Sequence, residues 1–351
     1  MKLLEKIQNI YHKASPQLRK RLIVLFSFLI IFNIAIWIFA FIQSMTYPLL
    51  LGLVVLSYGL GLRHAVDADH IAAIDNTTRK LMQDGKKPVA VGFFFSLGHS
   101  SIVVILSVLI AISSAFVKQN LPTFEQTGSL IGTSVSSFFL LVIGLINLIV
   151  LIDIFKIWLH VVKHGHYNES HLQEHLENRG LLVRIFRPFL KGVTNSWNMY
   201  FVGFLFGLGF DTASEVGLLS LSAATGAKGI PVYDIILLPL AFTAGMALVD
   251  SIDGVLMLGA YGWAYMKPIR KLYYNLNITF ISVLIALLIG GIEALQIISG
   301  QLMLEGGFFT FINNLDFGNL GYFIIGTFVI SWIISILIYR IKRYDLLEAK
   351  K

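Results

Sequence analysis

The sequence predicts an all-α polytopic integral membrane protein with eight transmembrane helices. Hydrophobic residues make up 56% of the 351 positions and charged residues only 13%, whereas soluble domains carry about 25% charged residues. Eight apolar runs are each long enough to cross a bilayer, which takes about 20 helical residues. The Lys and Arg residues between these runs alternate in density from one connection to the next, as expected for a multi-pass protein.

The apolar runs define the expected helices in order. We expect them near residues 22–42, 48–71, 89–112, 129–152, 198–222, 235–262, 275–298 and 320–339. The first run lacks a small-residue cleavage pattern and is therefore expected to stay as a helix. The longest connection, about 153–197, is too short and too polar to bury a core of its own. The sequence thus predicts a single transmembrane transporter domain over 1–351.

Basic residues indicate the orientation. Apart from Arg63, Lys118 and Lys228, every Lys and Arg falls in the N-terminal leader, in alternate connections or after the last run. Because cytoplasmic connections are enriched in these residues, both termini are predicted to be cytoplasmic. The net charge of +7 does not indicate nucleic acid, since the basic residues are spread over every inner connection. Contact with the anionic surface of a lipid bilayer explains them better.

The second apolar run carries five ionisable side chains close together, those of Arg63, His64, Asp67, Asp69 and His70. A single charged residue at mid-bilayer costs about 2.5–3.5 kcal/mol, so such residues usually mark a path for an ion, proton or substrate. On a straight helix His64, Asp67 and His70 share one arc, whereas Asp69 lies about 100° from His70. If the helix unwinds, as transporter helices do at their sites, Asp69 can join the others.

Other expected helices carry polar groups as well. Asp211 and Glu215 share a helix face at a spacing of four residues, and Asp250 and Asp253 do so at a spacing of three. Imidazole and carboxylate ligands without thiolate suit Ni, Co, Zn, Cu(II) or Fe(II), and the chain has no Cys. The predicted metal ligands are His64, Asp67, Asp69, His70, His99, Asp211, Glu215, Asp250 and Asp253, with Arg63, Ser100 and Asn147 around them as counter-ion or hydrogen-bonding groups.

For three intramembrane polar residues, a structural role is favoured. Asn147, Glu293 and Gln296 stand outside the His and Asp clusters. Polar side chains commonly hydrogen-bond membrane helices to one another. We expect that role for all three, and for Asn147 it is an alternative to a place beside the metal.

A short internal similarity suggests a repeat. Gly59-Leu60-Gly61 precedes the cluster of the second run, and Gly207-Leu208-Gly209 precedes that of the fifth, so that Asp67 aligns with Glu215. Gly98-His99 and Gly245-Met246 then follow at nearly equal distances. Because the second and fifth helices are predicted to run in opposite directions, the hypothesis is an inverted repeat relating helices 2–3 to helices 5–6, with a site between the halves.

The connection after the fourth run is rich in histidine. It contains His160, His164, His166, His171 and His175, of which two pairs are spaced by four residues and can chelate from one helix face. One hypothesis is a cytoplasmic metal relay that passes the ion to a cytoplasmic acceptor. The alternative is a solvated loop that happens to be rich in His.

Four motifs resemble the signatures of the nickel/cobalt transporter (NiCoT) family. They are His64 followed after four residues by Asp69-His70, Leu97-Gly98-His99-Ser100-Ser101, Leu208 through Glu215, and Gly245-Met246 through Asp250-Ser251-Ile252-Asp253. Ser214 and Ser251 stand where Thr is common in the family. The resemblance implies high-affinity, low-capacity uptake of Ni(II), Co(II) or both across the bacterial cytoplasmic membrane, without a permanent cofactor. It also implies metal recognition by His64, Asp69 and His70.

Three functions remain open at this point. The favoured one is a secondary metal permease, since the chain has no G-x-x-x-x-G-K-[ST] motif for ATP. The second is efflux of a divalent metal on the same scaffold, because direction depends on coupling and gradients. The third is an intramembrane metal-dependent hydrolase, which would need an open coordination position and a substrate cleft. We expect a transporter and no enzyme.

Overall fold

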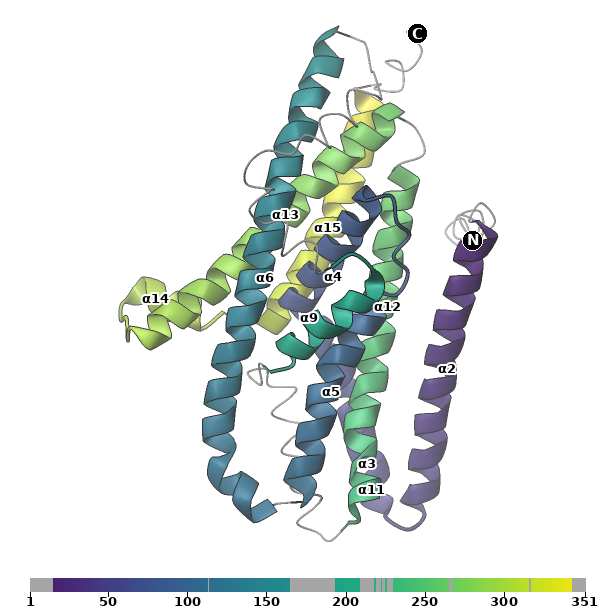
Figure 1. The fold of residues 1–351 in the computed structure, drawn as a ribbon, viewed down its shortest axis with the longest axis vertical. Coiled ribbons are helices and arrows are strands. Elements are labelled where there is room, and N and C mark those ends of the chain that lie inside the picture. Colours follow the sequence, from purple (N-terminus) through teal and green to yellow (C-terminus); the bar gives the residue numbers. More distant parts are fainter. Residues whose placement is uncertain are drawn as a thin grey trace.

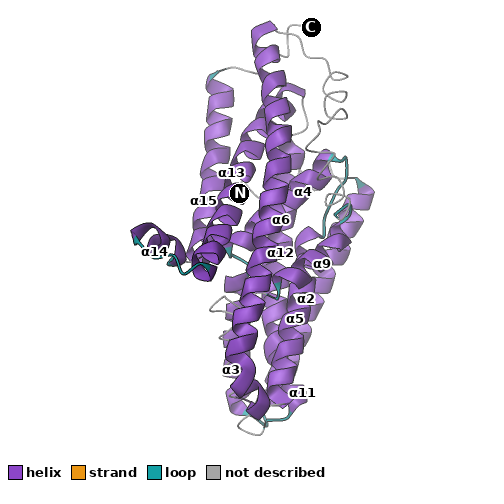
Figure 2. Cartoon of the chain, turned by 60° about the vertical axis from the view of Figure 1, so that its left-hand side comes forward, coloured by secondary structure: helices purple, strands orange, loops and turns teal. Residues whose placement is uncertain are grey.

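The computed structural model describes residues 15–112, 114–164, 193–208, 230–264, 268–315 and 317–342, together with residues 218, 222 and 225. Within these ranges the secondary structure is helical, without strands (Figures 1 and 2). The helices are α2 (Pro16–Ser44), α3 (Pro48–His64), α4 (Ala68–Gln83), α5 (Val91–Ile112), α6 (Ser114–His164), α9 (Met199–Phe206), α11 (Val232–Ile235), α12 (Leu237–Ala264), α13 (Pro268–Gln301), α14 (Gly307–Asn313) and α15 (Phe317–Ile341).

Most of these helices run along the long axis of the molecule, and the short α14 stands off to one side in both views (Figures 1 and 2). In the described part, six helices are long and apolar enough to cross a membrane, and the bent pair of α3 and α4 adds a seventh span if it is counted as one. The chain is therefore a multi-pass membrane protein. The predicted helix 198–222 is represented by α9 alone, since most of its remainder lies outside the described residues.

Helix α6 differs from the prediction of 129–152. It begins at Ser114 and ends at His164, so both flanking segments, which were expected to be loops, are helical. The connection predicted to begin at residue 153 therefore begins only after His164, about three helical turns later. Residues 165–192 lie outside the described residues, and the description resumes at Val193.

The prediction of one straight helix over 48–71 is wrong, and the alternative of an interrupted helix is correct. The chain leaves α3 after His64 and enters α4 at Ala68, and the two helices are bent by 55°. Asp67 is extended, with φ −67° and ψ 149°, and is the N-cap residue of α4. Its carboxylate contacts Arg63 and His64 at the end of α3 and accepts no backbone N–H of α4. The N-cap residue of α4 is thus paired with side chains of the preceding helix.

Helix α4 is buried along most of its length. It packs against α6, α12, α13 and α15, and Arg79 is fully buried within it. Arg79 and Lys80 were predicted to lie in a loop, and this is wrong because both belong to α4 and their side chains are buried. A polar helix in such surroundings needs internal partners for its side chains.

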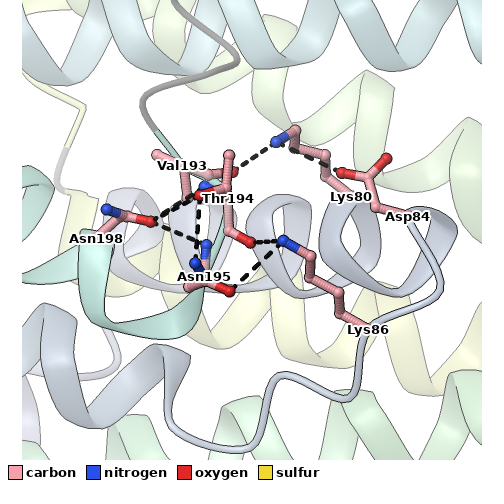
Figure 3. A network of polar contacts seen from close by, with 7 residues as sticks. All are labelled: Lys80, Asp84, Lys86, Val193, Thr194, Asn195 and Asn198. Atoms are coloured by element: carbon pink, nitrogen blue, oxygen red, sulfur yellow. Dashed lines mark hydrogen bonds and ion pairs between the residues drawn. The ribbon is translucent and has the colours of Figure 1, made fainter.

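The C-terminal end of α4 is tied to the segment before α9 (Figure 3). Lys80 Nζ donates to the carbonyl oxygen of Val193 at 2.6 Å and lies 3.7 Å from the carboxylate of Asp84. Lys86 donates to the carbonyl oxygen of Thr194. These contacts hold residues 193 and 194 against the end of α4 and the segment that follows it, although more than 100 residues separate them in the sequence.

Helices α3 and α12 approach each other closely at two glycines. A Cβ atom on Gly61 would overlap the backbone of Phe242, and one on Gly245 would lie 2.7 Å from the carbonyl oxygen of Tyr58. Small residues at such points let membrane helices pack backbone to backbone. The pairing fixes the end of α3, where His64 lies, against α12.

Helices α5 and α9 meet in the same way. A Cβ atom on Gly98 would overlap the carbonyl oxygen of Tyr200, and one on Gly203 would overlap the backbone of Phe95. Gly98 directly precedes His99. The α5–α9 contact therefore fixes the position of a third histidine, as the α3–α12 contact fixes that of His64.

The two contacts lead to adjoining apolar clusters. One cluster, around Phe242, joins α2, α3, α5, α11 and α12, and the other, around Phe95, joins α4, α5, α6, α9, α13 and α15. The ring of His64 contacts Phe242 at a centroid distance of 5.5 Å, and the ring of His70 contacts Phe95 at 4.7 Å. The histidines thus lie where the two clusters meet.

We predict that Gly61→Ala lowers the thermal unfolding midpoint of the purified protein, because overpacking a close contact costs about 1–3 kcal/mol. Gly59→Ala is the matched control on the same helix. No atom lies within 4 Å of a Cβ at Gly59, so Ala should leave the midpoint equal or slightly higher through its better helix propensity. Equal midpoints for the two variants would contradict the close α3–α12 contact.

Candidate metal site

Three buried histidines converge from three helices. His64 ends α3, His70 lies in the first turn of α4, and His99 lies in α5. Each offers a ring nitrogen within 4.8 Å of the other two, and all three side chains are buried. The ring centroids are 4.6 Å apart for His64 and His70, 4.7 Å for His64 and His99, and 5.0 Å for His70 and His99. The group has the composition of a three-imidazole metal site.

The closest pair of nitrogens has a spacing that suits a metal ion. The Nε2 atoms of His64 and His99 are 3.0 Å apart. With imidazole–metal distances of about 2.0–2.1 Å, as at zinc, two ligands at right angles lie about 3 Å from each other. The two rings can therefore bind one ion with little movement, and between themselves they share a hydrogen bond whose donor depends on the tautomer.

Two carboxylates lie behind the histidines. The Nδ1 atom of His64 is 3.2 Å from Oδ2 of Asp67, and the Nδ1 atom of His70 is 3.3 Å from Oδ2 of Asp250. A carboxylate at Nδ1 fixes the tautomer and leaves Nε2 for a metal. In agreement, His70 Nε2 is buried and has no hydrogen-bond partner among the described residues. Asp67 and Asp250 are thus hydrogen-bond partners of the histidines in this geometry.

The break between α3 and α4 separates the two acidic residues of the second run. Arg63 forms an ion pair with Asp67, which balances part of the negative charge beside His64. Asp69 lies in the first turn of α4, where its Oδ1 accepts the backbone N–H of His70 at 2.9 Å. A carboxylate is favourable at a helix N-terminus because the N–H groups there carry partial positive charge. Asp69 thereby helps to fix the backbone of His70.

A second acidic group lies farther along α4 and α12. The carboxyl group of Asp253 is within electrostatic range of those of Asp75 and Asp250, and the side chain of Asp75 is fully buried. Asp75 was not among the predicted metal ligands, because it lies beyond the predicted end of the second helix. Its position five residues after His70, on a continuing helix, would have been the only available signal.

Polar residues outside the histidine group link helices to one another. Asn147 of α6 donates through Nδ2 to Oδ1 of Asn76 at 2.9 Å, and Arg79 donates to the same oxygen at 3.2 Å. Glu293 of α13 accepts from Ser136 Oγ at 2.9 Å. The helix-linking role predicted for Asn147 and Glu293 is confirmed by these contacts.

The structure describes only some of the other residues singled out in the sequence. Gln296 also has the predicted linking role, since it donates to the carbonyl oxygen of Ile312 at 2.9 Å. Ser100 is buried next to His99. Outside the described residues lie Asp211, Glu215, His166, His171 and His175, and of His160 and His164 at the end of α6 the side chains are not described.

The comparisons identify a family. Residues 50–338 match the family model described as high-affinity nickel-transport protein. The chain belongs to this family. It is 50% identical over 345 residues to the high-affinity nickel transport protein of Cupriavidus necator, with 98% of each chain covered. No solved structure matches the chain.

Two further relatives widen the comparison within the nickel-transport family. The nickel transporter NixA of Staphylococcus aureus is 48% identical over 307 residues, which cover 88% of this chain and 90% of the relative. The cobalt transport protein NhlF of Rhodococcus rhodochrous is 38% identical over 293 residues and 82% of each chain. These proteins are transporters by name, so the chain is a membrane transporter and not an enzyme, and nothing in these names favours efflux or hydrolysis.

We predict graded losses of nickel binding when the site is altered in the purified protein. His70→Ala removes a predicted ligand and should abolish measurable binding, while Asp250→Ala removes the hydrogen-bond partner of His70 and should weaken binding by about 10–100-fold. Asp84→Ala, which removes a partly exposed carboxylate at the far end of α4, is the control. Isothermal titration with Ni(II) measures all three. Unchanged affinity in Asp250→Ala would contradict its role beside His70.

Proposed function

We propose that this protein is a secondary permease that carries Ni(II), and Co(II) as a second substrate, into the cytoplasm. The observation that supports it most directly is the group of His64, His70 and His99, three buried imidazoles on membrane helices. Relatives named as nickel transporters support the nickel substrate, and the relative named as a cobalt transporter supports cobalt. The membrane is proposed to be the bacterial cytoplasmic membrane.

The arrangement explains how a hydrated dication would enter a low-dielectric region. The three imidazoles replace water molecules of the ion through their nitrogens. Asp67 and Asp250 stay at the Nδ1 atoms, where they supply negative charge and hold the rings. The three imidazoles are neutral, so they hold the dication less strongly than charged ligands would, and this favours its release further along the path.

Carboxylates are proposed to extend the path on both sides of the histidines. Asp253 with Asp75 would take the ion along α4, and Asp211 with Glu215 would complete the site from the fifth helix, with Ser100 beside His99. The His-rich connection, His160 through His175, would receive the ion on the cytoplasmic side and pass it to an acceptor there. The first part of this path is supported by the electrostatic influence of Asp75 on Asp253, which places the two carboxyl groups in the same region.

We further propose eight transmembrane helices, two cytoplasmic termini and an inverted repeat. The repeat is supported by the paired glycine contacts, since Gly61 meets Phe242 as Gly203 meets Phe95. This equivalence aligns Gly61 with Gly203, whereas the sequence similarity had aligned Gly61 with Gly209. In the new register Asp69 aligns with Asp211, so each half would contribute an acidic residue at the same point.

Uptake into proteoliposomes tests the function. Vesicles that contain only this protein should accumulate radiolabelled nickel, and His70→Ala should reduce the initial rate at least about 10-fold because a metal ligand is lost. His12→Ala, in the N-terminal leader, is the control for removal of a histidine. Wild-type vesicles that take up no more nickel than empty ones would contradict the permease.

Cells distinguish uptake from efflux. Deletion of the gene should lower cellular nickel at limiting external concentrations, as measured by elemental analysis, because an importer is removed. A rise in cellular nickel on deletion would instead establish the efflux alternative, which uses the same site in the opposite direction.

A further inference from the structure

A buried serine lies one turn before His99 on α5. Ser96 is fully buried, and its Oγ is 2.6 Å from Oδ2 of Asp250 on α12. The same hydroxyl is 2.9 Å from the carbonyl oxygen of Gly92 in its own helix. The contact with Asp250 lies within the usual range for an O–H···O⁻ hydrogen bond, about 2.5–2.7 Å, and is therefore a charge-assisted one.

Both contacts of Asp250 are made by one of its oxygens. Oδ2 lies 2.6 Å from Ser96 Oγ and 3.3 Å from His70 Nδ1, whereas the buried Oδ1 has no hydrogen-bond partner among the described residues. Ser96 and His70 therefore hold Oδ2 between them. As long as they do, the carboxylate cannot rotate without losing a charge-assisted hydrogen bond.

We propose that Ser96 is a positioning and specificity-determining residue for the transported ion. By donating to Asp250 it keeps that carboxylate behind His70 and out of the coordination sphere, so that the ion meets the Nε2 atom of His70 and not an oxygen of Asp250. Imidazole suits Ni and Co, whereas carboxylate oxygens suit harder divalent cations such as Mn(II). The proposal rests on the function proposed above and concerns its selectivity.

Removal of the hydroxyl should change which ions compete. In Ser96→Ala, Asp250 is held by His70 alone and can turn an oxygen toward the ion. We expect the apparent KM for nickel uptake to rise about 10-fold, as for loss of an outer hydrogen bond at a metal site. We also expect Mn(II) to inhibit nickel uptake at a lower concentration than in the wild type, with the maximal rate per folded protein little changed. Ser96→Thr, which retains a hydroxyl, should restore both.

Ser107→Ala is the matched control. Ser107 is a buried serine on the same helix whose Oγ has no hydrogen-bond partner among the described residues. Unchanged nickel KM and Mn(II) inhibition in Ser96→Ala would overturn the proposal. So would a fall in folded protein or maximal rate with unchanged Mn(II) inhibition, because that result indicates packing alone.

Binding to the purified protein separates this proposal from the transport function. Ni(II) and Mn(II) are titrated into wild type, Ser96→Ala and Ser107→Ala in detergent. A smaller preference for Ni(II) over Mn(II) in Ser96→Ala alone supports the proposal even if wild-type vesicles fail to take up nickel, and an unchanged preference overturns it. Failure of the transport function is shown only by the wild-type vesicles.

Discussion

The break between α3 and α4 is the feature on which the rest of the site depends. Along a continuous helix, His64 and His70 would be separated by about 9 Å of rise, because each residue adds 1.5 Å. In the structure their ring centroids are 4.6 Å apart. The extended residue Asp67 produces this approach, and its carboxylate remains on Arg63 and His64, the residues just before the break. Asp67 thus both brings His64 close to His70 and balances the positive charge of Arg63.

Burial of so many polar groups is tolerated because each helix supplies partners for the next. A buried charge is costly unless it is paired and hydrogen-bonded. Asp250 of α12 is held by Ser96 of α5 and His70 of α4, so three helices meet at one carboxylate. The close glycine contacts of α3 with α12 and of α5 with α9 bring the backbones near enough for these short side chains to reach each other.

Much of the fold and part of the site could be predicted from the sequence. The membrane class, most of the helices and the three histidines could be predicted, because apolar run length and ligand type are local properties. The break was only one of two alternatives, since residues 62–84 contain neither Gly nor Pro, the usual local signals for interrupting a helix. Arg79 and Lys80 were assigned to a loop because basic residues outside apolar runs are typical of cytoplasmic connections. Nothing local indicated that α4 continues inward among α5, α6, α12, α13 and α15.

Distances between helices decided the remaining assignments. The sequence ranked Asp67 and Asp250 with the histidines as ligands, and only the positions of their oxygens relative to Nδ1 show them behind the rings. The role of Ser96 could not be predicted, because serine is common in membrane helices and Asp250, its hydrogen-bond partner, lies 154 residues away in the sequence.

X-ray absorption at the nickel edge of the purified, nickel-loaded protein tests the central claim most directly. If His64, His70 and His99 bind the ion together, the spectrum should show outer-shell scattering from three imidazole rings, and His99→Ala should reduce this to two. A first shell of oxygen alone, or imidazole scattering that does not change in His99→Ala, would contradict the claim.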